Sequence, residues 1–204
     1  MVGFYNYTVI LTYAGLCSTV FGMTLALSGN LKGAILALLV SGLCDGFDGT
    51  IAKTRKRTEE EKRFGIQIDS LCDVICFGVF PALFLYALGV RSAAGIAVMV
   101  FYVLCGVIRL AYFNVTEETR QSQTNGARKE YIGVPISAAA LATPFAFLFR
   151  GLLGDAFPIA YAVWLLIVGF LFIAPVRVPK PHGKAMIPIV AVGAALFVWF
   201  FISA

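Results

Sequence analysis

Charged side chains are scarce in this sequence. Only 13% of its 204 residues are Asp, Glu, Lys or Arg, whereas soluble domains contain about 25%. Hydrophobic residues make up 60% of the chain and fall in long blocks. This composition excludes a soluble globular domain and a disordered chain, and it predicts an integral membrane protein made of helices.

Soft metal ligands and disulfide signals are also few. The sequence has one histidine and five cysteines, and no two cysteines form a Cys-x-x-Cys pair. An odd number of cysteines, all within apolar blocks, argues against a disulfide framework. There is no internal repeat or low-complexity stretch and the loops are short, so we expect residues 1–204 to form a single domain.

Seven apolar blocks are long enough, or nearly so, to cross about 30 Å of hydrocarbon, which takes around 20 helical residues. They are residues 8–29, 31–53, 65–89, 92–113, 131–151, 157–175 and 184–203. The blocks are continuously apolar rather than alternating, which favours helices over barrel strands. The first block lacks a basic n-region and a clear cleavage site, so we interpret it as a span and not a signal peptide. The expected fold is an all-α, polytopic transmembrane bundle of about seven spans.

Basic residues are unevenly distributed between the two ends of this bundle. Cytoplasmic loops are enriched in Lys and Arg. With a cytoplasmic N-terminus, 13 of the 16 basic residues fall in or beside the loops at 54–64, 114–130 and 176–183, and only Lys32, Arg91 and Arg150 lie outside. We therefore predict a cytoplasmic N-terminus. The net charge of +5 would also attract anionic lipid headgroups, and no basic soluble region indicates binding to nucleic acid.

Four of the 11 carboxylates lie inside expected spans. Asp45 and Asp48 are near the end of the second span, and Asp69 and Asp73 lie in the third. A carboxylate within a spanning helix costs about 2.5–3.5 kcal/mol, and no equal set of intramembrane Lys or Arg is available to pair with all four. These residues therefore indicate a functional site.

The spacing of the four aspartates allows them to form one cluster. Asp45 and Asp48 are i, i+3 and Asp69 and Asp73 are i, i+4, so each pair projects from one helix face. A short connection joins the two helices, which makes them neighbours. An all-oxygen ligand set favours a hard cation, Mg²⁺, Mn²⁺ or Ca²⁺, over Zn²⁺. The cluster can hold one ion or two, and two ions would suit phosphoryl chemistry.

Glycines and basic residues accompany the aspartates. Gly46 and Gly49 follow Asp45 and Asp48, and Gly65 lies one turn before Asp69. Small residues in a membrane helix allow close approach of a helix or a ligand. The basic stretch 53–57 at the mouth of the cluster suits a phosphate-bearing substrate, although membrane anchoring explains Arg55, Lys56 and Arg57 equally well.

These residues resemble the signature of the CDP-alcohol phosphotransferases, which reads Asp-x-x-Asp-Gly-x-x-Ala-Arg, a spacer, and Gly-x-x-x-Asp-x-x-x-Asp. Seven of the eight fixed positions match: Asp45, Asp48, Gly49, Ala52, Gly65, Asp69 and Asp73. Lys53 stands where the family usually has Arg, which keeps the charge but loses a bidentate phosphate contact. The spacer, residues 54–64, is somewhat longer than usual.

Four further stretches are similar to the branch of this family that uses serine. They are Asp69 to Asp73 followed by Phe77 to Pro81, Arg109 to Asn114, Tyr131 to Pro135, and Arg177 to Pro181. The resemblance implies a six-helix core with one extra helix, and transfer of a phosphatidyl group from CDP-diacylglycerol to serine with release of CMP. It also implies that a homodimer is plausible.

The resemblance implies a role for each matching residue. Asp45, Asp48 and Asp69 would be metal ligands, and Asp73 would face the metal and act as general base. The nucleotide would lie against Gly49, Ala52 and Gly65, with Lys53 near its phosphates. These assignments place a divalent cation, Mg²⁺ or Mn²⁺, at the centre of the site, where Ca²⁺ can also bind.

Serine is a zwitterion whose carboxylate needs a cationic partner. Arg109 lies near the expected inner end of the fourth span, where an unpaired Arg would be costly. We expect it to bind the serine carboxylate or a lipid phosphate, with interfacial snorkelling as the alternative. Asn114 could bind substrate, but its position at the predicted end of the span favours a role at the helix end.

Two other functions remain open from the sequence. The acceptor could be glycerol 3-phosphate or an inositol phosphate, since the inner loops hold enough basic residues for a second anionic pocket. A cation or proton transporter could also use intramembrane aspartates, but transport sites usually lie near the midplane and often involve inverted repeats. We expect the enzyme to reside in the inner membrane of a prokaryote, with its active site facing the cytoplasm.

Overall fold

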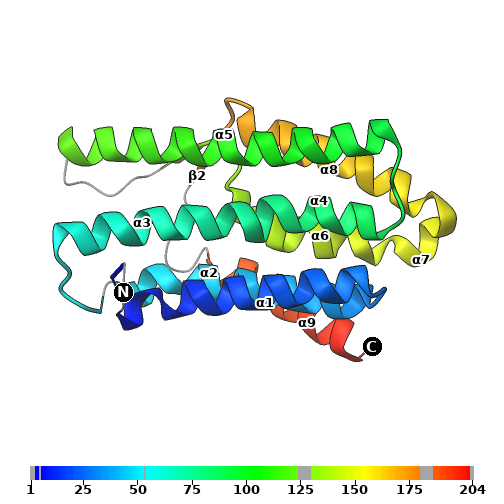
Figure 1. Cartoon of the computed structure of the whole chain (residues 1–204), viewed down its shortest axis with the longest axis horizontal. Coiled ribbons are helices and arrows are strands. Elements are labelled where there is room, and N and C mark those ends of the chain that lie inside the picture. The colour runs from blue at the N-terminus through cyan, green and yellow to red at the C-terminus, as the bar shows by residue number, and fades with distance from the viewer. Residues whose placement is uncertain (1–2, 5, 53, 124–129, 180–185, 203–204) are drawn as a thin grey trace.

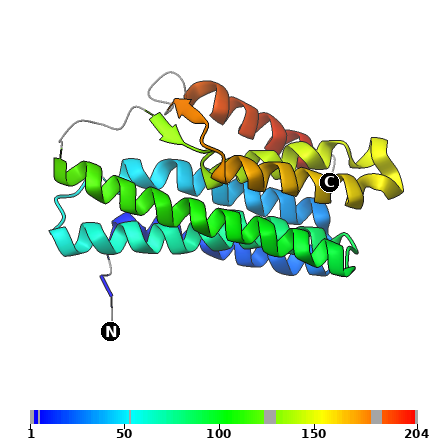
Figure 2. The same ribbon diagram turned by 90° about the horizontal axis from the view of Figure 1, so that it is seen from above.

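The computed structural model describes residues 3–4, 6–52, 54–123, 130–179 and 186–202. Figure 1 shows long helices running side by side, and Figure 2 shows the same bundle from above. The helices are α1 (Ile10–Leu27), α2 (Leu31–Ala52), α3 (Glu59–Asp73), α4 (Phe80–Ala87), α5 (Ala93–Gln123), α6 (Ala139–Leu148), α7 (Arg150–Leu153), α8 (Phe157–Ile173) and α9 (Met186–Ile202). Three 3₁₀ turns, η1 (Tyr7–Val9), η3 (Ile136–Ala138) and η4 (Gly154–Ala156), and a π-helical segment, η2 (Val74–Val79), adjoin them.

The all-α, membrane-spanning prediction is confirmed. Five helical stretches are long and apolar enough to cross a membrane: Tyr7–Leu27, Leu31–Ala52, Glu59–Ala87, Ala93–Arg120 and Arg150–Ile173. Two shorter apolar helices, Ile136–Leu148 and Val190–Ile202, fall where the fifth and seventh spans were expected. The chain is therefore a polytopic helical membrane protein.

The first two helices form a close antiparallel pair. The turn between them uses Gly29, whose φ of +88° is readily available only to glycine. The Oδ1 atom of Asn30 then accepts a hydrogen bond from the Gly33 amide at 2.9 Å and caps α2. At Gly22 the helices are so close that a Cβ atom would lie 2.8 Å from the Ala37 Cβ. Small residues thus set the spacing of α1 and α2.

The helix α3 begins within the predicted cytoplasmic loop. Thr58 Oγ1 accepts from the Glu61 amide at 3.2 Å, and Glu61 Oε2 accepts from the Thr58 amide at 3.0 Å. This reciprocal capping box satisfies two of the amides that a helix start leaves without partners. The charged segment that hydropathy assigns to a loop is therefore partly helical, and it extends α3 beyond the apolar span.

A π-helical segment continues α3 into α4. Pro81 has no N–H, so the carbonyl of Phe77 lacks its ordinary helical donor four residues later. The hydroxyl of Tyr102, a fully buried residue of α5, donates to this carbonyl at 2.8 Å. The irregular segment is thus tied to α5 directly after Asp73.

Two expected spans have different boundaries. The fourth was expected to end at residue 113, but α5 continues to Gln123 and includes an i, i+3 ion pair between Arg120 and Glu117 at 2.6 Å. Asn114 therefore lies well inside a helix, and its expected role at the helix end is wrong. Polar side chains end an apolar block without ending a helix, which is why the hydropathy boundary failed.

The fifth expected span, residues 131–151, begins with non-helical structure. Strand β1 (Glu130–Ile132) pairs antiparallel with β2 (Arg177–Pro179). Gly133 follows at φ +79°, where a Cβ would lie 2.4 Å from the carbonyl oxygen of Phe172. That contact explains why glycine is needed at this turn, and it delays the helix until η3 and α6.

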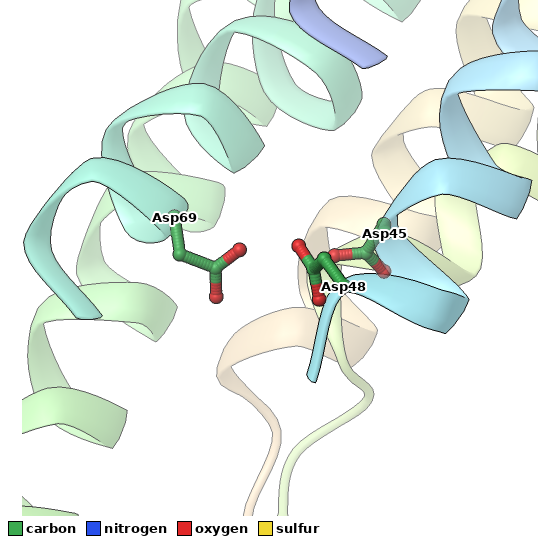
Figure 3. Close-up of side chains that lie close together, drawn as sticks. All are labelled: Asp45, Asp48 and Asp69. Atoms are coloured by element: carbon green, nitrogen blue, oxygen red, sulfur yellow. The ribbon is translucent and has the colours of Figure 1, made fainter. Parts of the chain in front are cut away.

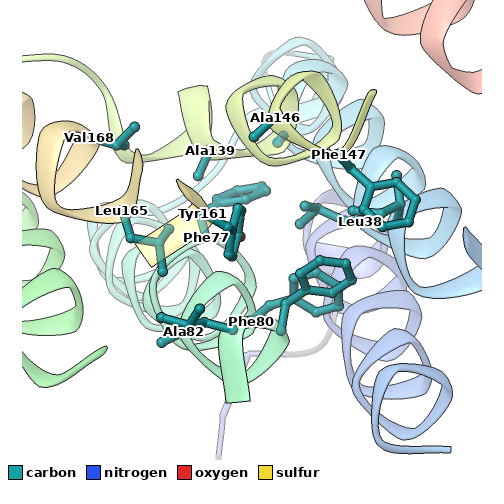
Figure 4. Packing of buried hydrophobic residues seen from close by; sticks show 14 of the residues in the cluster. Leu38, Phe77, Phe80, Ala82, Ala139, Ala146, Phe147, Tyr161, Leu165 and Val168 are labelled. Atoms are coloured by element: carbon teal, nitrogen blue, oxygen red, sulfur yellow. The ribbon is translucent and has the colours of Figure 1, made fainter. Parts of the chain in front are cut away.

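Buried aromatic rings hold the middle of the bundle together (Figure 4). Phe84 packs edge-on against Phe147 and Tyr161, each with centroids 5.6 Å apart. Leu38 of α2 and Phe80 of α4 are fully buried in the same cluster. This core fixes the relative positions of the helices that carry the aspartates.

Candidate metal centre

Three carboxylates from two helices converge at one end of the bundle. Asp45 and Asp48 come from the last turns of α2, and Asp69 comes from α3 (Figure 3). One oxygen from each carboxylate lies within 4.8 Å of the others. The predicted convergence of the two helix faces is therefore observed for these three residues.

Asp73 completes the cluster from one turn further along α3. Its carboxyl group lies outside the set of three but close to that of Asp45. All four aspartates line a small cavity of about 10 Å³, together with Thr12, Gly15, Ser41, Cys44, Cys72, Cys76 and Phe77. A space of this size admits about one water-sized particle and excludes a nucleotide.

The electrostatics of the cluster favour a cation. At an effective dielectric constant of about 20, two unit negative charges 4.8 Å apart repel by roughly 3 kcal/mol. No Lys or Arg lines the cavity in the described part of the chain. The Oδ1 atom of Asp69 is buried and has no hydrogen-bond partner among the described residues. An unsatisfied buried carboxylate oxygen within a set of oxygen donors fits a hard divalent ion.

Neutral hydroxyl groups lie beside two of the carboxylates. Thr12 on α1 donates from Oγ1 to Asp48 Oδ2 at 3.2 Å. Ser137 on η3 interacts with Asp45. Neither residue could be found from the sequence, because both are far from the aspartates in the chain and no local spacing links them.

Three cysteines from the apolar blocks also line the cavity. Cys44, Cys72 and Cys76 lie on the same helices as the aspartates. They do not belong to the group of ligand atoms that lie within 4.8 Å of one another. The three-residue candidate ligand set therefore remains an oxygen set.

The described candidate nucleotide-binding residues lie on the same two helices as the aspartates. A Cβ atom at Gly46 or Gly49 would meet nothing within 4 Å, so the surface beside the aspartates is open there. At Gly65 a Cβ would lie 3.2 Å from Arg57 Nη1, which places a guanidinium group next to α3. Ala52 is half-buried at the end of α2. Lys53 lies outside the described residues.

Arg109 and Asn114 both lie on α5 and make defined contacts. Arg109 is only 7% exposed, its Nε donates to the Val134 carbonyl at 3.1 Å, and its guanidinium group lies 4.9 Å from the centre of the Phe113 ring. Asn114 Nδ2 donates to Ser70 Oγ at 2.9 Å. Neither residue lines the 10 Å³ cavity, but Ser70 directly follows Asp69, so Asn114 links α5 to the helix that carries Asp69.

The bundle and its acidic cluster define a polytopic helical membrane protein with a candidate metal centre towards one end of its spanning helices. The profile of the CDP-alcohol phosphatidyltransferase family matches residues 5–202. This chain belongs to that family, as the resemblance of its aspartate signature implied.

Named relatives share the family and differ in length. The archaetidylserine synthase of Methanothermobacter thermautotrophicus is 32% identical over 175 residues, which cover 85% of this chain and 70% of the relative. A CDP-diacylglycerol–serine O-phosphatidyltransferase of Saccharomyces cerevisiae is 36% identical over 59% of this chain and 44% of its own length. The Helicobacter pylori protein of the same name is 33% identical over 70% of this chain and 59% of its own length. The matched region thus spans less than two thirds of the latter two proteins.

Proposed function

We propose that this protein transfers a phosphatidyl group from CDP-diacylglycerol to the hydroxyl group of serine, forming phosphatidylserine and releasing CMP. The observation that carries the proposal is the convergence of Asp45, Asp48 and Asp69, with Asp73 beside them, in a chain of this family. The names of the relatives support serine as the acceptor.

The aspartate cluster would hold a divalent cation, Mg²⁺ or Mn²⁺, with Asp45, Asp48 and Asp69 as ligands. Four carboxylates could also hold a second ion, and Ca²⁺ would also fit an oxygen ligand set. The bound cation would neutralise the pyrophosphate and the charge that develops on the leaving group. Thr12 and Ser137 would keep the carboxylates of Asp48 and Asp45 oriented before the substrate arrives.

Asp73 would serve as the general base. It would accept the proton of the serine hydroxyl while the serine oxygen forms a bond to the phosphorus that carries diacylglycerol. The bond from this phosphorus to the bridging oxygen breaks, and CMP leaves with that oxygen. Asp73 suits this role because it lies beside the three ligand residues and outside their group.

The nucleotide would lie over the open surface at Gly49, near Ala52 and Gly65. This placement of the nucleotide is supported by the free space at Gly49 and by the guanidinium group of Arg57 beside Gly65. Lys53 would approach the phosphates as a point charge. Since the inner cavity is only about 10 Å³, the nucleotide would stay outside it and place only its pyrophosphate against the aspartates.

Arg109 and Asn114 would shape the acceptor side of the site. Arg109 supplies a buried positive charge for the serine carboxylate or a lipid phosphate. Asn114 would act through Ser70, which it contacts at 2.9 Å, by holding α5 against the helix that carries Asp69. These two residues are the part of the proposal that bears on the choice of acceptor.

The proposed setting is the inner membrane of a prokaryote, with the aspartates facing the cytoplasm. It is supported by the excess of basic residues in the loops at that end. We further propose one domain over residues 1–204. A homodimer remains a prediction, for which cross-linking in membranes is the test.

The decisive experiment measures release of radiolabelled CMP from labelled CDP-diacylglycerol by purified protein in detergent with Mg²⁺ or Mn²⁺. Serine, glycerol 3-phosphate and inositol phosphate are supplied in parallel, and the corresponding archaetidyl donor is a further arm. D73N is compared with D155N, because Asp155 is an exposed carboxylate outside the cluster. We expect serine-dependent release that D73N abolishes and D155N retains.

The other outcomes separate the competing functions. Release with a different acceptor would keep the family activity and reject serine. Absence of release with every acceptor and metal, from protein that still binds Mn²⁺, would reject the transferase and favour a cation transporter. A transporter should also show no stabilisation by CMP, whereas the proposed enzyme should be stabilised by CMP together with the metal.

A further inference from the structure

The segment before α1 is attached to the start of α3, although the two are far apart in the sequence. The ring of Phe4 packs edge-on against that of Phe64, with centroids 5.6 Å apart. The hydroxyl groups of Tyr7 and Thr54 are 3.1 Å apart and share a hydrogen bond. We call the described part of residues 3–9 the N-terminal strap. Figure 1 shows it in dark blue, at the same end of the bundle as the start of α3.

Asn6 uses both ends of its side-chain amide in the strap. Its Oδ1 atom accepts from the Thr8 amide at 3.0 Å and caps η1. Its Nδ2 atom donates to Glu61 Oε1 on α3 at 3.4 Å. Because η1 leads directly into α1 and Thr8 is only 3% exposed, the strap is a fixed extension of α1. Asn6 therefore connects the first helix to the third.

Glu61 joins three segments through one carboxylate. Besides the contact with Asn6, its Oε1 atom lies 3.4 Å from Arg55 Nη2, and its Oε2 atom accepts from the Thr58 amide at 3.0 Å. The Glu61 side chain is only 15% exposed, whereas that of Glu59 in the same helical turn is 81% exposed. A capping box needs only the exchange with Thr58. The contacts with Asn6 and Arg55 are additional, and they tie the strap and the connection between α2 and α3 to the start of α3.

The connection that is held in this way joins the two helices of the candidate metal centre. It follows α2, which carries Asp48, and precedes α3, which carries Asp69. It contains the three consecutive basic residues 55–57. Arg57 is half-buried, and its Nη1 atom lies 3.2 Å from the place where a Cβ atom of Gly65 would be. A cation that is held in place before a phosphate arrives loses less conformational freedom on binding than a mobile one.

We propose that Glu61 is a positioning residue for the donor substrate and that it acts together with Asn6. These two residues hold the connection so that the guanidinium group of Arg57 meets the phosphates of CDP-diacylglycerol beside Gly65. Arg55 is engaged with Glu61 and keeps the connection in place. Glu61 acts through the connection and does not touch the donor. This inference rests on the proposed function, because the donor belongs to that reaction, and it adds residues that lie outside the aspartate signature.

The test measures steady-state CMP release by the full chain in detergent, with CDP-diacylglycerol and serine varied separately, and titrates each protein with CMP in the presence of Mn²⁺. The variants are E61A, E61Q, N6A and the double variant of E61A with N6A. E60A is the matched control, because Glu60 lies in the same helical turn and is exposed. E61Q separates charge from capping, since glutamine completes the same capping box but loses the ion pair with Arg55.

We expect E61A to raise both the KM for CDP-diacylglycerol and the Kd for CMP by about tenfold, because the basic connection is no longer fixed before binding. The kcat, the KM for serine and the Mn²⁺ affinity should stay within about twofold, since the aspartates keep their positions. E61Q should raise the donor KM by about threefold, because it loses only a partly exposed ion pair. N6A should also raise it by about threefold, and the double variant should be no worse than E61A, because both substitutions break the same contact. E60A should behave like the original chain.

The other outcomes separate this inference from the proposed function. An unchanged donor KM in E61A, while the original chain releases CMP, would overturn the inference and leave the proposed function intact. Equal rises in the KM for donor and serine, or a fall in kcat alone, would also overturn it, because Glu61 would then serve only the fold. Absence of both CMP release and CMP binding in the original chain would reject the proposed function and this inference together. If E61A fails to fold, as judged by Mn²⁺ binding, an unchanged donor KM in both E61Q and N6A would overturn the inference.

Discussion

At the scale of single residues, neutral groups and not cations support the carboxylates of the cluster. Thr12 donates to Asp48, and Ser137 interacts with Asp45. A hydroxyl donor fixes the orientation of a carboxylate and leaves its negative charge available to a metal. An arginine in the same place would have neutralised the ligand.

Replacing Thr12 by valine tests this orientation. T12V keeps the size and branching of the side chain but removes the hydroxyl group that contacts Asp48 at 3.2 Å. Since outer partners of metal ligands typically contribute 10- to 100-fold to affinity, we expect Mn²⁺ to bind about 10- to 100-fold more weakly by electron paramagnetic resonance titration. T12S restores the donor and should retain the affinity. Unchanged Mn²⁺ binding in T12V would mean that the hydroxyl does not orient Asp48.

Arg109 offers a second prediction at this scale. In R109Q we expect the KM for serine to rise by about 10-fold or more, because a hydrogen bond to a charged group contributes about 1.5–3 kcal/mol. The KM for CDP-diacylglycerol should stay within twofold. Steady-state CMP release measures both constants. A rise in KM that is confined to the lipid donor would instead assign Arg109 to a lipid phosphate. Because R109Q also loses the buried contact with Val134, retained Mn²⁺ binding is the check that the variant is folded.

At the scale of elements, the helix that carries Asp69 and Asp73 is unusual because it changes its winding directly after Asp73. Segment η2 lies between α3 and α4, where Pro81 deprives the Phe77 carbonyl of its ordinary donor four residues later. Tyr102 supplies the missing hydrogen bond from α5. Irregular winding of this kind is often found at functional sites, and here one buried hydroxyl group ties it to the neighbouring helix.

The expected effect of Y102F is a loss of about 1–3 kcal/mol of stability, because a buried carbonyl loses its side-chain donor while the ring remains in place. Thermal unfolding in detergent measures the change. Y112F is the control on the same helix, since Tyr112 is 51% exposed, and it should change stability by less than about 0.5 kcal/mol. Equal stability of Y102F and the original chain would show that η2 does not depend on this bond.

The elements also show which parts of the fold the sequence could reveal. Hydropathy located the spans because burial in lipid requires long apolar runs, and it placed Asp45, Asp48, Asp69 and Asp73 on adjoining helices. It could not locate the end of α5, because helix formation continues through polar residues after Asn114. It also could not find the contact of Asn114 with Ser70, which depends on how α5 packs against α3.

At the scale of the whole molecule, the fold holds carboxylates that repel one another close together, and this arrangement forms a candidate cation site. Asp45, Asp48 and Asp69 converge within 4.8 Å, and one buried oxygen of Asp69 has no hydrogen-bond partner in the part of the chain that the structure describes. Such an arrangement stores unfavourable electrostatic free energy when no cation is bound. Sites built for function often reduce stability in this way.

Metal removal and D69N together test this trade-off. In EDTA we expect D69N to unfold at a higher temperature than the original chain, by the equivalent of about 1–3 kcal/mol, because one of the repelling charges is gone. Adding Mn²⁺ should raise the Tm of the original chain and leave that of D69N nearly unchanged. D155N, altered far from the cluster, should follow the original chain in both conditions. Lower stability of D69N in EDTA would contradict stored repulsion.

The helices beside the cluster differ in how far they extend past it. Asp48 is four residues from the end of α2, whereas α3 begins ten residues before Asp69, about 15 Å of helix. An ion pair between Arg63 and Glu118, with 3.8 Å between Nη2 and Oε1, connects this extension to α5.

For the proposed reaction, one substrate is dissolved in a two-dimensional sheet and the other in a volume of water. The turnover rate should therefore follow the mole fraction of the lipid donor in the bilayer, so that adding inert lipid slows the enzyme at constant bulk donor concentration.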